Sequence, residues 1–264
     1  MHMIGRERRM GRILKPDGKT LIVPMDHGVS VGPIKGITDL RETTKELVEG
    51  GADAVLMHRG WARTVDTQGI GLIVHVSAGT STGPKPLHKF VVCSVQEAIR
   101  LGADAVSFHV NVGSETEDEQ LEALGAISDQ CSLFGMPLVA MMYPRGPKVA
   151  SEHDPQAVAH ASRIGAELGA DIVKTNYTGS IESFKEVVRS CPVPVVVAGG
   201  PKMGSVKELL VMVRDSMLAG GRGVSIGRNI FQHSSPKLMT AAMRKIVHEG
   251  STVEEAMSFL GEVP

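Results

Sequence analysis

One phrase occurs four times in this 264-residue chain, and it constrains the fold more than any other feature. In each copy an amphipathic helical stretch ends at glycine and runs directly into a short apolar segment, as in EGGADAVLMH, RLGADAVSFHV, ELGADIVKT and LAGGRGVSIG. Glycine commonly ends helices, and an apolar run bounded by such a stop is typical of a buried strand. The repeat therefore predicts helix, glycine, strand units that build a parallel sheet.

Four further apolar runs lie between these copies, at 20–28, 71–77, 136–146 and 191–200, which brings the predicted strands to eight. Eight strands alternating with helices in a chain of this length predict the α/β class and a single-domain (β/α)8 TIM barrel over residues 1–264, with a short N-terminal extension. A doubly wound open sheet is the alternative. We interpret 77–90 as a long loop after the third strand and 114–120 as an acidic helix start.

The charge balance limits the partners of the chain. Lys and Arg total 28 against 29 Asp and Glu, so the chain lacks the excess of positive charge that would indicate nucleic acid or an anionic membrane as a partner. We find no signal peptide and no uninterrupted apolar stretch of about 18 residues. Cys93, Cys131 and Cys191 lie far apart in apolar runs, which indicates buried thiols in a reducing, cytoplasmic compartment rather than disulfides or a zinc site.

Polar side chains at the carboxyl ends of the predicted strands are the candidates for function, because the active site of a barrel lies there. Six strands end in such residues, and they are Asp26, His27, His58, His75, His109, Tyr143, Arg145 and Lys174. The last two strands end instead in Gly199-Gly200 and Gly227-Arg228.

These terminal glycines predict a phosphate site. Glycine lets backbone N–H groups approach an anion closely, a short following helix adds its N-terminus, and Arg228 adds a charge-assisted contact. Either motif alone fits an ordinary turn, but the pair on adjacent final strands favours phosphate binding.

Lys174 ends an otherwise apolar strand, an unusual place for one of the least often buried residue types. One interpretation places its stem along the barrel rim with the ammonium in water. The other turns the side chain into the barrel mouth, where desolvation and nearby cations favour a neutral amine that attacks a ketone to form a Schiff base.

Schiff-base chemistry needs proton transfer, and two strand-end residues could provide it. Tyr143 ends the strand before that of Lys174 and could exchange protons with a substrate hydroxyl, or it could be a structural rim tyrosine. Asp26 could accept a proton or hold a hydroxyl, and the sequence Asp-His-Gly could equally be a helix-capping turn.

Two other classes of function stay open at this point. Histidines at four strand ends could converge on zinc and support a metal-dependent barrel lyase. No two of them, however, lie at the close sequence spacing typical of zinc ligands. A noncatalytic phosphosugar sensor could keep only the glycine pairs, but a sensor has no need of Lys174, Tyr143 and Asp26.

Five motifs in order, PMDHGVS, MMYPRG, VKTNYTG, VVVAGGPK and SIGRNIFQH, resemble the archaeal class I aldolase family, with likeness over about residues 10–256. The resemblance implies a Schiff base on Lys174, with Tyr143 as proton donor and Asp26 as proton acceptor. It further implies substrate contacts by His27, Gly28, Val29, Ser30, Pro144 and Arg145 and phosphate contacts by Gly199, Gly200, Gly227 and Arg228. No metal and no organic cofactor are implied.

Within the family the chain is more similar to its transaldolase-like branch, because Met141 stands where the fructose-1,6-bisphosphate aldolases tend to have Trp. This branch implies transfer of a hydroxyacetone unit from 1-deoxy-D-threo-hexo-2,5-diulose 6-phosphate to L-aspartate 4-semialdehyde. Fructose-1,6-bisphosphate aldolase activity is the alternative. A homo-oligomer, in some relatives a decamer, is also implied. The sequence leaves open which basic loop residue binds the acceptor or a second phosphate, among Arg59, Arg63, Lys85 and Lys89.

Overall fold

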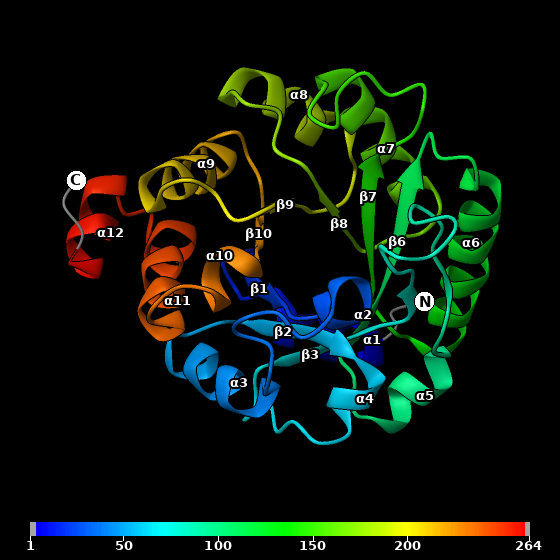
Figure 1. Cartoon of the computed structure of the whole chain (residues 1–264), viewed down its shortest axis with the longest axis horizontal. Helices are drawn as coiled ribbons and strands as arrows, with labels where there is room; N and C mark the ends of the chain where they lie inside the picture. Colours follow the sequence, from blue (N-terminus) through cyan, green and yellow to red (C-terminus); the bar gives the residue numbers. More distant parts are fainter. Residues whose placement is uncertain (1–3, 262–264) are drawn as a thin grey trace.

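The computed structural model describes residues 4–261 and shows eight parallel strands closed into a barrel, in the order β1-β10-β9-β8-β7-β6-β3-β2 (Figure 1). The predicted barrel is therefore confirmed, and all eight predicted runs supply a strand. The strands are β1 Thr20–Pro24, β2 Ala54–His58, β3 Gly71–His75, β6 Ala105–Val112, β7 Leu138–Pro144, β8 Ile172–Thr175, β9 Val195–Ala198 and β10 Gly223–Ser225.

Helices surround the barrel and join successive strands (Figure 1). Most begin at a Ser, Thr or Asp whose side chain accepts a hydrogen bond from the first turn, for example Ser94, Asp154 and Ser205. They are α1 Ile4–Ile13, α2 His27–Val31, α3 Leu40–Glu49, α4 Arg59–Ala62, α5 Val95–Arg100, α6 Glu117–Phe134, α7 Pro155–Glu167, α8 Ile181–Ser190, α9 Val206–Leu218, α10 Arg228–Phe231, α11 Pro236–Arg244, the π-helical turn η1 Lys245–Glu249 and α12 Val253–Leu260.

The repeated phrase of the sequence corresponds to a repeated structure at the amino ends of the strands. Its glycine takes a positive φ in all four copies, at Gly51, Gly102, Gly169 and Gly220. Its aspartate, present in three copies, accepts a hydrogen bond from the first part of the preceding strand. The bonds are Leu21 N to Asp53 at 2.7 Å, Leu72 N to Asp104 at 3.0 Å and Leu138 N to Asp171 at 2.9 Å.

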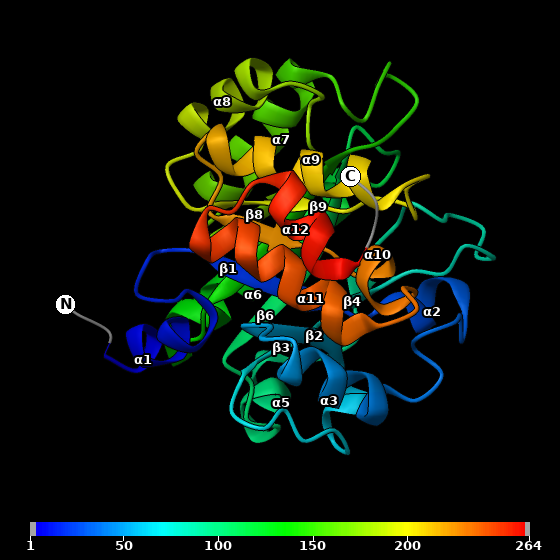
Figure 2. The same ribbon diagram turned by 90° about the vertical axis from the view of Figure 1, so that its left-hand side faces the viewer.

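The predicted N-terminal extension includes α1, which covers the amino end of the barrel, opposite α2 and α10 (Figure 2). Ile13 is fully buried in the cluster that fills the barrel interior. Two arginines of α1 pair with repeat aspartates, Arg12 with Asp104 at 2.8 Å and Arg6 with Asp171. The same aspartates therefore tie neighbouring strands together and hold the helix that closes this end.

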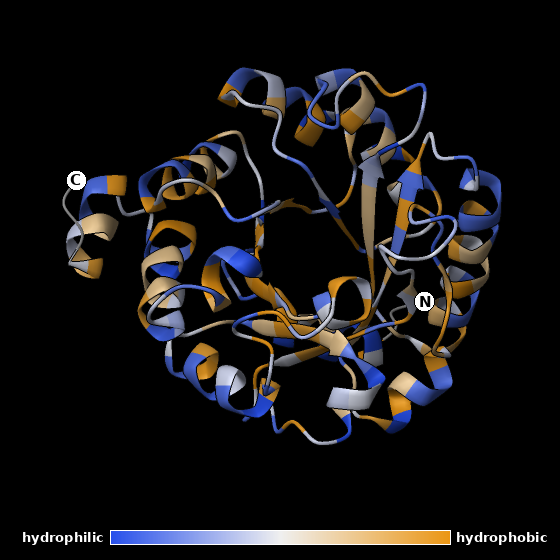
Figure 3. Cartoon of the chain, viewed as in Figure 1, coloured by the Kyte–Doolittle hydropathy of each residue, from blue (hydrophilic) through white to orange (hydrophobic). Residues whose placement is uncertain are grey.

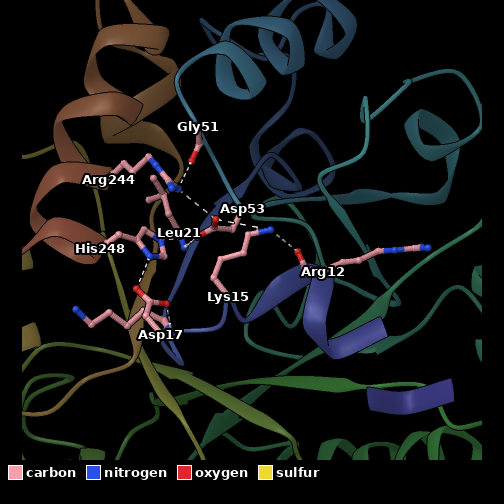
Figure 4. Close-up of polar contacts among 9 residues, drawn as sticks. Arg12, Lys15, Asp17, Leu21, Gly51, Asp53, Arg244 and His248 are labelled. Atoms are coloured by element: carbon pink, nitrogen blue, oxygen red, sulfur yellow. Dashed lines mark hydrogen bonds and ion pairs between the residues drawn. The ribbon is translucent and has the colours of Figure 1, made fainter. Parts of the chain in front are cut away.

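The remaining repeat aspartate, Asp53, is the centre of a separate ionic cluster at the same end of the barrel (Figure 4). His248 of η1 bridges two carboxylates, with Nε2 at 2.7 Å from Asp53 and Nδ1 at 2.8 Å from Asp17. Arg244 and Lys15 approach Asp53 at 3.5 and 3.8 Å. The C-terminal helical layer is thereby linked to the start of β1 and β2.

Strand residues alternate between two hydrophobic clusters. Ile22, Ile73 and Val139 belong to the cluster inside the barrel, whereas Val23 and Val74 belong to the larger cluster between strands and helices. Figure 3 shows hydrophobic residues along most of the strands and mixed colours on the surrounding helices. This alternation decides which strand residues face the barrel interior.

The segment predicted as a long loop after the third strand carries a small antiparallel ribbon, β4 Ser77–Ala78 with β5 Phe90–Val91. The three cysteines are buried and free, as expected from their apolar surroundings. Within residues 4–261, no helix combines the length and the apolar composition that a bilayer span requires.

Candidate active site

A cavity of about 300 Å³ opens at the carboxyl ends of the barrel strands. Six of the eight barrel strands, β1, β6, β7, β8, β9 and β10, contribute residues to it directly or through the segments after them, together with the segment between β4 and β5. Its walls are Pro24, Asp26, His27, Ser30, Val31, Gly79, Ser81, Pro86, Lys89, His109, Met141, Tyr143, Arg145, Lys174, Asn176, Ala198, Gly199, Gly200, Ser225, Gly227 and Arg228.

Lys174 lies in this cavity and is only 7% exposed. Its direction follows from strand alternation, because Ile172 belongs to the interior cluster and Val173 to the outer one. Lys174 pairs in register with Met141 on β7 and Val196 on β9. The amine is therefore directed into the barrel mouth, away from bulk water.

Asp26 lies at the N-cap position of α2, but its side chain makes no capping hydrogen bond. Its carboxylate oxygens lie 3.7 Å from Nδ1 of His27 and 3.8 Å from Nε2 of His75. Burial opposes ionisation of Asp26, yet His75, His27 and Lys174 outweigh it and hold the pKa below its ordinary value. Asp26 is therefore an ionised carboxylate that lines the cavity and does not cap the helix.

His75 is a neutral imidazole in this environment. Burial lowers the pKa of His75 to about 3. Both ring nitrogens have hydroxyl partners, Ser107 at 2.7 Å and Ser77 at 3.2 Å. The His75 ring also meets that of His58 edge-on, with centroids 5.1 Å apart. At neutral pH the imidazole therefore supports Asp26 as a polar neighbour, and it becomes a charged partner of the carboxylate only as the pH falls toward 3.

Tyr143 ends β7 inside the barrel and is held between two side chains. His109 meets its ring edge-on with centroids 5.0 Å apart, and the Arg145 guanidinium carbon lies 4.6 Å from its centroid. Nε2 of His109 in turn lies 2.9 Å from the Asn111 side-chain oxygen. Burial, with Arg145 and Lys89 nearby, holds the pKa of His109 well below its usual range.

The ends of β9 and β10 form what we call the glycine cradle, Gly199, Gly200 and Gly227 with Arg228. A Cβ on Gly227 would lie 2.3 Å from the Pro24 carbonyl oxygen, and one on Gly199 would lie 2.6 Å from Ile226. Gly200 has a φ of 60°. The Arg228 Nη2 donates to the Gly200 carbonyl at 2.9 Å and so links the two strand ends.

Three polar atoms of the cavity wall are buried and have no hydrogen-bond partner within residues 4–261. They are Arg228 Nε, His27 Nδ1 and Ser225 Oγ, all beside the glycine cradle or its neighbouring strand. Buried polar groups are almost always satisfied in proteins. Their clustering here indicates a site that accepts a polar ligand.

Most of the predicted site residues are brought together, but Gly28, Val29 and Pro144 are not among the cavity walls. The reason for the first two is that residues 27–31 form a short helix. Its positions 27, 30 and 31 face the cavity, as the spacing of one helix face requires, and Val29 is 39% exposed on the other side.

The sequence prediction missed several cavity residues. Asn176 follows Lys174 by two positions, so the strand-end rule could have found it. Gly79, Ser81 and Pro86 come from the ribbon segment, whose path no local pattern reveals. Three of the four strand-end histidines, His27, His58 and His75, lie near Asp26. Even so, no group of three or more His, Cys, Asp or Glu within residues 4–261 could hold a metal ion.

A parallel barrel with a buried lysine, a carboxylate and a phenol at its mouth defines a class of lyases and transferases that act on carbonyl carbon. The chain belongs to the DeoC/LacD family of aldolases, whose model matches residues 20–233. The predicted aldolase resemblance is thereby confirmed.

The relatives narrow the class further. The 2-amino-3,7-dideoxy-D-threo-hept-6-ulosonate synthase 1 of Archaeoglobus fulgidus is 47% identical, over 99% of this chain and 98% of its own. The 2-amino-4,5-dihydroxy-6-oxo-7-(phosphonooxy)heptanoate synthase of Streptomyces griseus is 41% identical, over 94% and 92%. Among solved structures, a Schiff base forming fructose-1,6-bisphosphate aldolase matches with a TM-score of 0.87 and 33% identity, over 92% and 100%.

Proposed function

We propose that this chain is a lysine Schiff-base transaldolase that transfers a hydroxyacetone unit from 1-deoxy-D-threo-hexo-2,5-diulose 6-phosphate to L-aspartate 4-semialdehyde, giving 2-amino-3,7-dideoxy-D-threo-hept-6-ulosonate. The observation that carries the proposal is Lys174, 7% exposed inside a cavity that also contains Asp26, Tyr143 and the glycine cradle. The 47% identity to a synthase of this name supports the choice of substrates.

In this mechanism the Lys174 amine adds to the donor ketone, and the carbinolamine loses water to give a protonated imine. The imine, at C2 of the donor, accepts electrons as the C3–C4 bond breaks, so the phosphorylated aldehyde leaves and an enamine of hydroxyacetone stays on the lysine. The enamine then attacks the aldehyde of the acceptor. Water hydrolyses the new imine, which releases the product and restores the amine.

Proton transfers at each step fall to Asp26 and Tyr143. Asp26, an ionised carboxylate, accepts the proton of the donor hydroxyl whose carbon becomes the leaving aldehyde. Tyr143 donates to the oxygen of the acceptor aldehyde as the new bond forms. The donor phosphate binds at the glycine cradle, where Arg228 Nε and Ser225 Oγ are buried without partners inside residues 4–261.

The test is borohydride reduction in the presence of each donor, followed by mass spectrometry of the peptides. We expect the hydroxyacetone mass on Lys174 with the diulose phosphate, and no adduct in Lys174→Met, whose circular dichroism matches the wild type. Fructose 1,6-bisphosphate serves as the comparison donor, and preferential turnover of it would make the aldolase reaction the function. Adduct formation on any other lysine would refute the mechanism.

We also infer that the chain assembles as a homo-oligomer, a decamer in the arrangement that the resemblance implies. Leu218 on α9 and Phe259 on α12, two helices that contact each other, are 57% and 42% exposed, which supports a buried interface in the assembly. Light scattering would show about ten times the 28.1 kDa chain mass. Three buried free thiols support a cytoplasmic location.

A further inference from the structure

Lys89 places a positive charge on the wall of the cavity that faces the glycine cradle. It immediately precedes β5, whose partner β4 begins two residues after β3 ends. In the closed ring of eight strands, β3 and β6 are three or four steps from β9 and β10. Lys89 and the cradle therefore stand on opposite sides of the mouth, with Lys174 on β8 between them along the ring.

The Lys89 ammonium is buried but weakly satisfied. The residue is 9% exposed, and its Nζ donates to the carbonyl oxygens of Gly79 at 3.4 Å and Pro86 at 3.3 Å, both longer than an ordinary N–H···O bond. No carboxylate within residues 4–261 forms an ion pair with it. A Cβ on Gly79 would lie 2.9 Å from Nζ, so the glycine leaves room for the ammonium.

The other basic residues near this side are either paired or outside the cavity. Arg63 forms an ion pair with Glu97 at 2.8 Å. Lys85 is exposed and lines a neighbouring pocket instead of the active-site cavity. Arg145 lines the cavity but pairs with Glu152 at 2.8 Å. Among the four loop cations that the sequence left open, Lys89 is thus the one that lines the active-site cavity.

The electrostatics of this wall favour an anionic ligand. Burial lowers the pKa of Lys89, and Arg145 adds to the effect, although Asp26 opposes it. An anion bound at Lys89 would offset both the desolvation and the repulsion by Arg145. An ammonium has three N–H donors, and two of those on Lys89 are directed at carbonyls. A single carboxylate matches the third.

We propose that Lys89 binds the carboxylate of the acceptor aldehyde and so makes the enzyme selective for a carboxylate-bearing acceptor. The assignment rests on the proposed transaldolase function. The departing aldehyde and the acceptor use the same carbon of the lysine-bound enamine, but their tails differ. The phosphate of the first suits the glycine cradle, and the carboxylate of the second suits the lone ammonium across the mouth.

The experiment isolates the acceptor half of the reaction by using hydroxyacetone as the donor. Wild type and Lys89→Met are compared in the addition of hydroxyacetone to L-aspartate 4-semialdehyde and to propanal, which has no carboxylate. We expect kcat/KM for the semialdehyde to fall about 10- to 100-fold in Lys89→Met, the range for a lost charged hydrogen bond, with propanal unchanged. Lys85→Met on the same loop is the matched control.

Borohydride trapping of hydroxyacetone on Lys174 is measured in parallel and should be equal in wild type and Lys89→Met. An unchanged preference for the semialdehyde in Lys89→Met would overturn the assignment of Lys89 and leave the proposed function intact. Loss of that preference in Arg228→Met instead would place the carboxylate at the glycine cradle. A wild type that forms no adduct on Lys174, or ignores the semialdehyde, would refute the proposed function itself.

Discussion

His109 meets the ring of Tyr143 edge-on, with the two ring centroids 5.0 Å apart, while Arg145 stacks near the same ring. These contacts hold the phenol in the barrel mouth through its ring rather than through its hydroxyl. The ring packing and the proposed proton-transfer role of Tyr143 can therefore be separated by a substitution that removes only the oxygen.

Tyr143→Phe keeps the ring contacts and removes the proton donor. We expect kcat for the complete transfer to fall about 10²- to 10⁴-fold, the usual value of a general acid. Imine trapping on Lys174 should fall much less, because the nucleophile is intact. Rapid-quench kinetics with borohydride separate the two steps. Equal loss of trapping and turnover would show that Tyr143 acts before the imine forms, contrary to the proposed mechanism.

Asp26→Asn tests the charge of the carboxylate. Neighbouring groups lower the pKa of Asp26 despite its burial, so the carboxylate stays ionised as the pH falls until well below the unfolded-state value of about 4. We expect a turnover loss of about 10²- to 10⁴-fold and a pH profile parallel to that of the wild type. If the acidic limb of the profile disappeared in the variant, Asp26 would titrate in that range and the charge assignment would be wrong.

The fold was predictable because the repeated phrase marks both where a helix ends and where the next strand begins. A glycine with positive φ ends each helix, and the apolar run after it has no other place than a buried strand. The same phrase did not reveal that Asp53, Asp104 and Asp171 bind the preceding strand. That role depends on strand order in space, which the local pattern does not contain.

The site was predictable where strands end and unpredictable where loops fold back. Lys174 and Tyr143 follow strand alternation directly, so their inward direction could be expected. Ser81 and Pro86 reach the cavity through a ribbon whose pairing joins residues over ten positions apart. The five-residue helix after Asp26 is too short for a periodic signal, so the sequence does not show that Gly28 and Val29 lie outside the cavity walls.

Arg228→Met tests the glycine cradle. The guanidinium holds the Gly200 carbonyl at 2.9 Å and has a buried Nε without a partner inside residues 4–261, so its loss should weaken phosphate binding. We expect KM for the phosphorylated donor to rise about 10- to 100-fold, with hydroxyacetone trapping unchanged. Isothermal titration with inorganic phosphate provides an independent measure. An unchanged affinity for phosphate would remove the cradle from the mechanism.

His248 gives a prediction about stability, because it bridges Asp53 and Asp17 at the end of the barrel far from the active site (Figure 4). Hydrogen bonds to Asp53 raise the pKa of His248 above its ordinary value despite burial, and Asp17 adds to the effect. A raised folded-state pKa stabilises the fold fully below the unfolded-state value of about 6.5. The contribution is lost as the pH rises through the folded-state pKa.

His248→Gln should therefore lower the free energy of unfolding by about 2 kcal/mol at pH 6, or the Tm by about 3–6 °C. The difference from wild type should shrink as the pH rises past the folded-state pKa, because the wild type then loses the charged bridge too. Arg244 and Lys15 stay near Asp53 and keep its carboxylate partly compensated. The exposed His160→Gln is the control, and Tm is followed by calorimetry from pH 5 to 9. A difference that grew with pH would mean that the neutral imidazole, not the imidazolium, stabilises this end of the barrel.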